Sequence, residues 1–143
     1  EIWLGLVGSE MCIRDSPDIV LFSSPGGNDA LQSLPYNETI NNIHAIIDLL
    51  QSNNPAVIIL IEQLAPGRSD IMTPTLSNYF SQLQIEIPTI ANNQSDSLSQ
   101  VITVDLQTGF TDNLLADEVH YNEAGADFIA ARYYTVLATI LEQ

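Results

Sequence analysis

Three short apolar runs restrict the fold of this chain more than any other feature of its sequence. Asp18 to Ser23 (DIVLFS), Ala56 to Ile61 (AVIILI) and Val101 to Leu106 (VITVDL) have the length of strands. Nearly continuous apolar runs of this length are typical of strands buried on both faces, as in parallel sheets. Because longer stretches with helical patterns separate the runs, the sequence predicts alternating strands and helices, and hence a parallel α/β sheet with right-handed crossovers.

The first two connecting stretches carry helix signals. Asn37 can cap a helix from Glu38 to about Gln51, in which apolar residues recur every three or four positions. A second helix is predicted from Thr75 to about Ile85 or further. Its end stays open because Ile87-Pro88 interrupts the pattern. Between the first strand and the first helix, Ser24 to Asp29 is predicted to form a turn.

The negative charge of the chain argues against binding to nucleic acid or to anionic membranes. The 143 residues include 18 Asp and Glu against 3 Lys and Arg, a formal net charge of −15. Such a surface repels nucleic acid and anionic membranes, because phosphate binding needs clustered cations. No apolar run reaches the roughly 18 residues that a membrane span needs. We therefore expect a single domain with no nucleic-acid partner and no membrane span, in a secreted or periplasmic setting.

The stretch Leu114 to Gly125 (LLADEVHYNEAG) places Asp117 three residues before His120, just ahead of a helix that Asn122 can cap and that runs from Glu123 to about Leu141. A carboxylate that accepts from one imidazole nitrogen fixes the tautomer and stabilises the imidazolium that forms when the other nitrogen takes a proton. Asp117 and His120 are therefore candidates for two members of a catalytic triad.

A second stretch, Pro17 to Ala30 (PDIVLFSSPGGNDA), strengthens this hypothesis. Together and in this order, the two stretches resemble the third and fifth sequence blocks of the SGNH hydrolases, also called the GDSL esterase/lipase family. The resemblance implies that Asn28 donates to the oxyanion hole, that His120 is the general base and that Asp117 orients it. The segment from Val101 to Tyr134 is similar to carbohydrate-esterase members that deacetylate polysaccharides. The implied substrate is thus a small-molecule or polysaccharide ester.

The resemblance also implies a fold. It is a three-layer flavodoxin-like parallel sheet flanked by helices, with strand order 2-1-3-4-5. The three runs of this chain would be strands 3, 4 and 5, so the first two strands of the family are missing. The run at Asp18 to Ser23 would then be an edge strand with Ile19, Val20, Leu21 and Phe22 exposed, and we expect an aggregation-prone or only partly folded chain.

Residues Glu1 to Ser16 are interpreted as foreign to the domain, which then covers Pro17 to Gln143. Leu6 to Ser16 (LVGSEMCIRDS) resembles the translation of a transposon-type sequencing adapter and is excluded from fold reasoning. The alternative is a genuine N-terminal segment, such as a short hydrophobic signal remnant. The only cysteine, Cys12, lies here, so no disulfide framework is expected.

The nucleophile of the implied triad is not found in this chain. Ser16 lies in an Arg-Asp-Ser sequence that mimics the family's nucleophile block, but only Pro17 separates it from the first run, whereas a parallel crossover needs a dozen or more residues. Ser23 and Ser24 follow the strand of the third block and are interpreted as loop residues. We expect the catalytic serine to lie outside this chain.

No cofactor and no metal are expected. The only histidines, His44 and His120, lie far apart in the sequence, so neither has a second histidine at i+3 or i+4 with which to form a zinc-type pair, and His44 is interpreted as a helix residue without a catalytic part. The acids Asp112, Glu118 and Glu123 are interpreted as a solvated rim or as helix-start charges, and Phe110 and Tyr121 as packing residues that flank the loop. Two alternatives stay open: a non-catalytic flavodoxin-like binding or receiver module, and a catalytically dead accessory domain.

Overall fold

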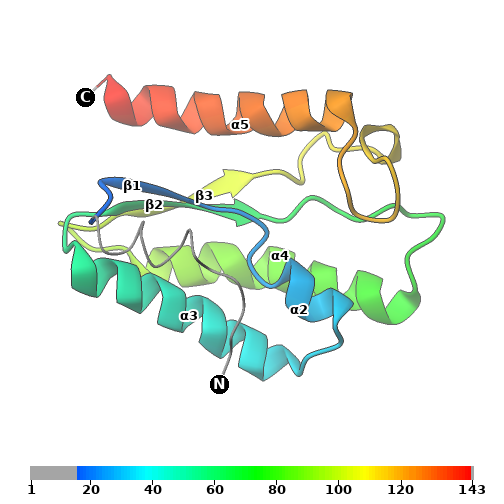
Figure 1. Ribbon diagram of the computed structural model, residues 1–143, viewed down its shortest axis with the longest axis horizontal. Coiled ribbons are helices and arrows are strands. Elements are labelled where there is room, and N and C mark those ends of the chain that lie inside the picture. Colours follow the sequence, from blue (N-terminus) through cyan, green and yellow to red (C-terminus); the bar gives the residue numbers. More distant parts are fainter. Residues whose placement is uncertain (1–15, 143) are drawn as a thin grey trace.

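The computed structural model describes residues 16–142, so the segment interpreted as adapter lies outside the described residues except for Ser16. Figure 1 shows three parallel strands sandwiched between helices. In chain order the elements are β1 (Ile19–Phe22), α2 (Gly27–Leu31), α3 (Tyr36–Asn53), β2 (Ile58–Gln63), α4 (Pro74–Gln94), β3 (Val101–Asp105), the 3₁₀ turn η1 (Asp112–Leu114) and α5 (Glu123–Leu141).

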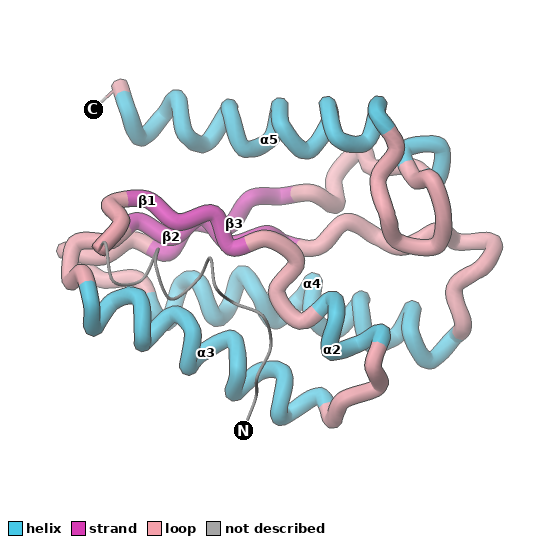
Figure 2. The backbone as a smooth tube through the Cα atoms, in the orientation of Figure 1, coloured by secondary structure: helices cyan, strands magenta, loops and turns pink. Residues whose placement is uncertain are grey.

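The sheet has the order β1-β2-β3 with every neighbouring pair parallel (Figure 2). Ile19 of β1 lies opposite Ile58 of β2, and Ile59 of β2 lies opposite Val101 of β3. The predicted α/β class with three contiguous parallel strands is therefore confirmed. Since all strands run the same way, their carboxyl ends meet at one edge, on the right-hand side of Figure 1.

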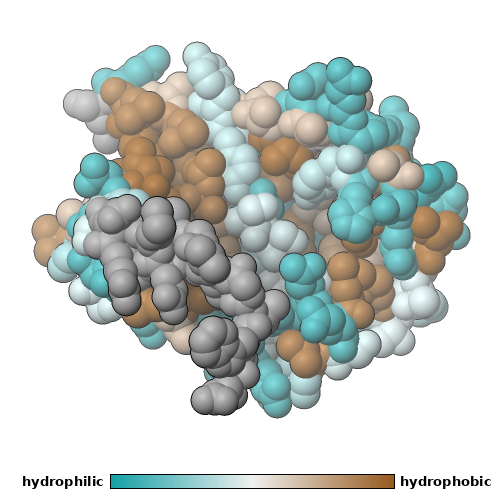
Figure 3. Space-filling view, in the orientation of Figure 1, coloured by the Kyte–Doolittle hydropathy of each residue, from teal (hydrophilic) through white to brown (hydrophobic). Residues whose placement is uncertain are grey.

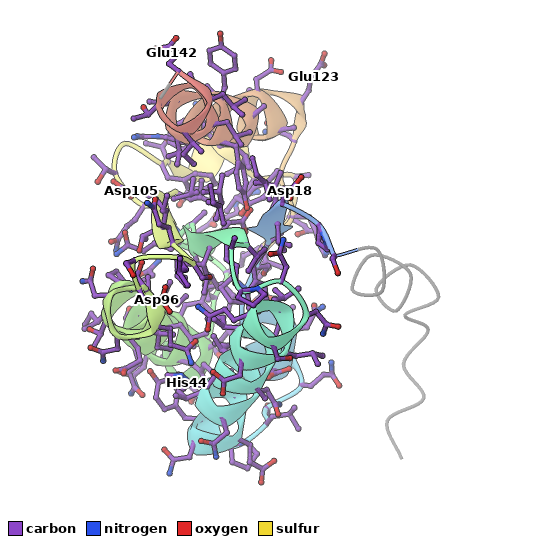
Figure 4. All side chains as sticks on the ribbon, turned by 90° about the vertical axis from the view of Figure 1, so that its left-hand side faces the viewer. Asp18, His44, Asp96, Asp105, Glu123 and Glu142 are labelled. Carbon is purple, nitrogen blue, oxygen red and sulfur yellow. The ribbon has the colours of Figure 1, made fainter. Side chains whose placement is uncertain are left out.

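Helices cover the two faces of the sheet unequally. α3 and α4 lie on one face and α5 on the other, as the view along the strands in Figure 4 also shows. On the first face, Ile59 and Ile61 of β2 are fully buried against Ile47 of α3 and Leu83 of α4. On the second face, Leu60 is fully buried, but most of the α5 side chains that pack around it are only partly buried. The main core thus lies under α3 and α4.

The predicted edge character of β1 is partly confirmed. Leu21 is 50% exposed, whereas Val20 and Phe22 pack against the α3–α4 core and Ile19 against the α5 side. Hydrophobic side chains gather on the surface in the region of α5 and the strands (Figure 3). No helix among residues 16–142 is long and apolar enough to span a membrane.

The sequence left the end of α4 open, and the structure places it at Gln94, with Pro88 in the interior of the helix. Proline lacks the N–H that would bond to the carbonyl four residues earlier, which here belongs to Gln84. That carbonyl accepts instead from Gln63 Nε2 of β2 at 2.8 Å. A neighbouring strand thus satisfies the group that proline leaves free.

Two smaller differences concern helix starts. α3 begins at Tyr36 with Pro35 as its N-cap, so the predicted cap Asn37 lies inside the helix. The predicted turn at Ser24 to Asp29 ends in the short helix α2. The last helix agrees with prediction, because Asn122 caps α5 by accepting from the N–H of Gly125 at 3.0 Å.

Candidate active site

A cavity of about 250 Å³ opens at the carboxyl edge of the sheet. Its wall is built from the β1–α2 turn, the loop after β2, Phe80 of α4 and the loop before α5. Asn28 and His120 both line it, although 92 positions separate them in the sequence (120 minus 28). The fold therefore brings to one cavity the residues that the resemblance implies to be the oxyanion donor and the general base.

Asp117 and His120 form the predicted pair. His120 Nδ1 lies 2.8 Å from Asp117 Oδ2 and 3.0 Å from Oδ1. The two side chains are largely open to solvent, at 76% for His120 and 58% for Asp117. With Nδ1 held by the carboxylate, Nε2 is the ring nitrogen left for proton transfer, which is the geometry that a general base requires.

Asp117 also shapes the loop that carries the pair. Its Oδ1 accepts from the backbone N–H of His120 at 2.9 Å and of Val119 at 3.0 Å. These backbone hydrogen bonds, first that of His120 and then that of Val119, together with the His120 side chain, lower the pKa of Asp117 to about 2. One carboxylate thus both closes the turn and orients the imidazole, and it is ionised at neutral pH.

Further contacts fix this loop, residues 114–122, which we call the His120 loop. Within it, Leu115 and Tyr121 form an isolated antiparallel bridge, and the N–H of Ala116 donates to the carbonyl of His120 at 2.8 Å. The loop after β2 braces it from outside, because the N–H of Arg68 donates to the carbonyl of Glu118 at 2.8 Å.

Asn28 is held by the turn between β1 and α2. Ser24 has a φ of 47° and Gly26 a φ of 78°, both in the left-handed region. At Gly26 a Cβ atom would lie 2.6 Å from Thr39 Cγ2, so this position needs glycine for both conformation and space. The turn delivers Asn28 to the first turn of α2 with an exposed side chain at the cavity.

Glu62 is the site-proximal residue that sequence reasoning missed. It lies on β2, is only 2% exposed, and its carboxylate accepts from Ser23 Oγ at 3.1 Å and from Tyr133 Oη at 2.9 Å. Burial, followed by the charge of Glu62, raises the pKa of Tyr121 to about 12, and the same two causes raise the pKa of Tyr133. The sequence signal for Glu62 was an acidic residue directly after an apolar strand. Its partners Ser23 and Tyr133 could not be identified, because they lie far away in the sequence.

The serines singled out in the sequence lie in different places. Ser16 precedes β1 and its Oγ donates to the carbonyl of Asn53 at 3.5 Å, at the amino edge of the sheet and hence opposite the cavity. Ser23 and Ser24 line the cavity, with the Ser23 hydroxyl already donating to Glu62.

The remaining candidates are also placed. His44 lies on α3 (Figure 4) and is not among the residues that line the cavity. Asp112 accepts from the N–H of Ser69 at 3.1 Å, and Glu123 lies in the first turn of α5. Tyr121 packs edge-on against Phe110, with ring centroids 5.8 Å apart, and also lines the cavity. Within residues 16–142, no three His, Cys, Asp or Glu side chains gather in an arrangement that could hold a metal ion.

The fold defines the class of this protein: a three-layer α/β protein with a parallel sheet and a cavity at the carboxyl ends of the strands. Comparison with solved structures makes that class more specific. The chain is similar to a carbohydrate esterase family 3 structure from Talaromyces cellulolyticus, with a TM-score of 0.77 and 22% identity over 91% of this chain and 61% of that one. It is also similar to a serine-to-alanine mutant of an acetyl esterase with acetate ion, with a TM-score of 0.76 and 25% identity over 88% of this chain and 59% of that one.

These similarities confirm the SGNH-hydrolase-like fold implied by the sequence resemblance. The chain spans about three fifths of the length of these solved structures. No family model and no curated protein sequence matches the chain.

Proposed function

We propose that this chain is part of a serine ester hydrolase that cleaves acyl esters, with acetyl esters of carbohydrates as the favoured substrate class. The observation that carries the proposal is the Asp117–His120 pair, with Nδ1 2.8 Å from the carboxylate, in a loop that lines the same cavity as Asn28. The two esterase structures with the same fold support the choice of ester hydrolysis over other acyl-transfer chemistry.

The residues divide the reaction between them. His120 Nε2 removes the proton of the serine hydroxyl as its oxygen bonds to the ester carbonyl carbon, and Asp117 stabilises the resulting imidazolium. The carbonyl oxygen becomes an oxyanion, to which the Asn28 amide donates. His120 then protonates the leaving alcohol as its bond to carbon breaks. A water molecule then attacks the acyl carbon while His120 takes a proton from it. The bond between this carbon and the serine oxygen breaks, which releases the acid, and His120 returns the proton to the serine.

The nucleophile is proposed to lie outside this chain. Ser16 is at the wrong edge of the sheet, and the Ser23 hydroxyl donates to Glu62. Loss of a triad nucleophile lowers turnover by on the order of 10⁶-fold. The 143-residue chain alone is therefore expected to show no meaningful esterase activity.

The decisive experiment measures hydrolysis of an activated acetate ester by the full-length protein with His120→Ala. We expect kcat to fall by about 10⁴-fold or more, because the base and the acid of the reaction are lost together. His44→Ala is the matched control, since His44 is the other histidine of the chain and lies on α3 but does not line the cavity. It should leave kcat unchanged.

Two results would contradict the proposal. Turnover that survives His120→Ala, or no turnover of any ester by the full-length wild type, would favour the non-catalytic flavodoxin-like binding or accessory module. Hydrolysis by the 143-residue chain that disappears with Ser24→Ala would instead place the nucleophile at Ser24.

A further inference from the structure

Glu62 is a buried carboxylate that the proposed chemistry does not use. It lies near the end of the central strand β2, opposite Val104 of β3 and only 2% exposed. It does not line the cavity, so it cannot touch a substrate there. Among the described residues no arginine forms an ion pair with it, and its partners are neutral donors.

One oxygen of Glu62 holds the turn that leads to Asn28. Oε2 accepts from the backbone N–H of Ser24 at 2.5 Å and from Ser23 Oγ at 3.1 Å. Ser24 has a φ of 47°, a conformation that non-glycine residues rarely adopt and that persists only where the surroundings enforce it. The carbonyl of Ser24 in turn accepts from the N–H of Gly27 at 3.0 Å, directly before Asn28. The carboxylate thus holds the strained residue from the sheet side.

The other oxygen of Glu62 reaches the helix that follows the His120 loop. Oε1 accepts from Tyr133 Oη of α5 at 2.9 Å. Burial and the charge of Glu62 raise the pKa of Tyr133, so its hydroxyl keeps the proton that it donates. Glu62 therefore connects residues 23–28, which we call the Asn28 turn, to α5, the helix that directly follows the His120 loop.

We propose that Glu62 is a positioning residue that fixes the Ser23–Ser24 turn, and through it the Asn28 amide, relative to His120. Burying a carboxylate is costly unless hydrogen bonds replace its lost hydration, so Glu62 depends on its three donors and fixes them in return. Only the consequence for catalysis rests on the proposed function. The structural claim, that Glu62 sets the conformation of the turn, stands on the contacts alone.

The test compares three substitutions in the full-length protein. Glu62→Met fills the space but removes every acceptor. Glu62→Asp keeps the charge but is one methylene shorter, which withdraws it from Ser24. Glu62→Gln is the conservative variant, because its oxygen can accept from Ser23 and Ser24 while its amide donates to the Tyr133 oxygen. Two different disruptive variants keep the test informative if one of them fails to fold.

The first readout needs no activity. Hydrogen exchange of the Ser24 amide should speed up by about tenfold or more in Glu62→Met and Glu62→Asp and stay near wild type in Glu62→Gln. The NMR signals of the Asn28 side-chain amide should shift in the same two variants. Unchanged exchange and unchanged Asn28 signals in both would overturn the proposal.

The second readout separates positioning from stability. In the same two variants kcat should fall by roughly 10- to 100-fold with KM nearly unchanged, as expected when a transition-state donor is displaced by about an ångström. Glu62→Gln should restore most of kcat. A displaced Asn28 with normal kcat would overturn the proposal. If the wild type hydrolyses no ester, the proposed function fails while hydrogen exchange still decides the structural claim.

A second pair of variants tests the hydrogen bond between Glu62 and Tyr133 of α5. Tyr133→Phe removes only the donor to Oε1 and should give a partial increase in Ser24 exchange. Tyr134→Phe, at the neighbouring position with a ring that is 74% exposed, is the matched control and should have no effect. Equal effects of the two would contradict the connection.

Discussion

The two walls of the candidate active site are held in different ways. The Asn28 turn rests on the molecule's main structure, with a buried carboxylate beneath Ser24 and the side chains of Thr39 and Leu83 against Gly26. The His120 loop rests largely on itself, through the bonds of Asp117 to the N–H groups of Val119 and His120. One wall is set by long-range packing and the other by local hydrogen bonds.

This difference suits the roles proposed for the two walls. An oxyanion donor acts by being preorganised, so it gains from a rigid base. A general base must change partners during the reaction, and the exposed His120 imidazole has freedom to do so on one side while Asp117 holds the other. The comparison predicts that changes in the buried support of the Asn28 turn act on stability and rate together, whereas changes in the His120 loop act locally.

The largest effect expected from changing the Asn28 wall concerns Asn28 itself. Asn28→Ala removes the proposed oxyanion donor and should lower kcat of the full-length protein by about 10²- to 10³-fold with little change in KM. Stability should change little because the side chain is exposed. Gln32→Ala, an exposed position that caps the end of the same short helix, is the control and should leave kcat unchanged. A loss confined to KM would mean that Asn28 binds substrate without stabilising the oxyanion.

The next effect compares two glycines with almost the same backbone conformation. Gly26 has a φ of 78° and Gly109, in the loop after β3, a φ of 80°. Alanine at either position costs about 1–2 kcal/mol for the left-handed conformation. At Gly26 the Cβ would also lie 2.6 Å from Thr39 Cγ2, whereas at Gly109 the nearest atom is 3.7 Å away.

We therefore expect Gly26→Ala to lower the free energy of unfolding by about 2–4 kcal/mol and Gly109→Ala by about half as much, measured by urea denaturation. Gly26→Ala should also lower kcat, because the strain lies in the Asn28 turn. Equal losses of stability would show that the close contact of Gly26 with Thr39 adds nothing to the cost of the left-handed conformation.

The sequence was sufficient for the local parts of this site. Asp117 and His120 could be paired because they lie three residues apart, and Asn122 could be assigned as a cap because capping is a local interaction. The strands and their parallel direction followed from the length and spacing of the apolar runs, whereas their order in the sheet followed from the family resemblance.

The parts that escaped prediction depend on distant partners. Glu62 meets Ser23 across 39 positions and Tyr133 across 71, and nothing in the strand sequence indicates either contact. The end of α4 stayed open in the sequence because of Pro88, and the helix continues because the side chain of Gln63 donates to the carbonyl that proline leaves free. The hydrogen bonds within the His120 loop are local, so they could be predicted. The contacts that support the Asn28 turn are long-range, so they could not.

The local character of the His120 wall can be tested by acid. Since the pKa of Asp117 is lowered from 3.8 to about 2 in the folded protein, its ionised form stabilises the loop above about pH 4, and this stabilisation is lost as the pH falls through about 2. The backbone amide signals of Val119 and His120 should therefore titrate together with a midpoint near 2. Asp117→Asn should abolish that transition. A midpoint near 3.8 would mean that the carboxylate is not bonded to these amides in solution.

The smallest expected effect concerns the contact between Ser69, in the loop after β2, and Asp112, just before the His120 loop. Asp112 accepts from the N–H of Ser69 at 3.1 Å and from its hydroxyl, which ties the loop after β2 to η1. These groups are exposed, so Asp112→Ala should lower the free energy of unfolding by less than about 1 kcal/mol in urea. Hydrogen exchange should nevertheless speed up at His120, because the loop after β2, whose Arg68 N–H donates to the carbonyl of Glu118 in the His120 loop, loses an anchor. Asp70→Ala is the control, since Asp70 pairs only with Arg68 of its own loop. If it speeds exchange at His120 equally, the contact between Ser69 and Asp112 does not contribute to holding the His120 wall.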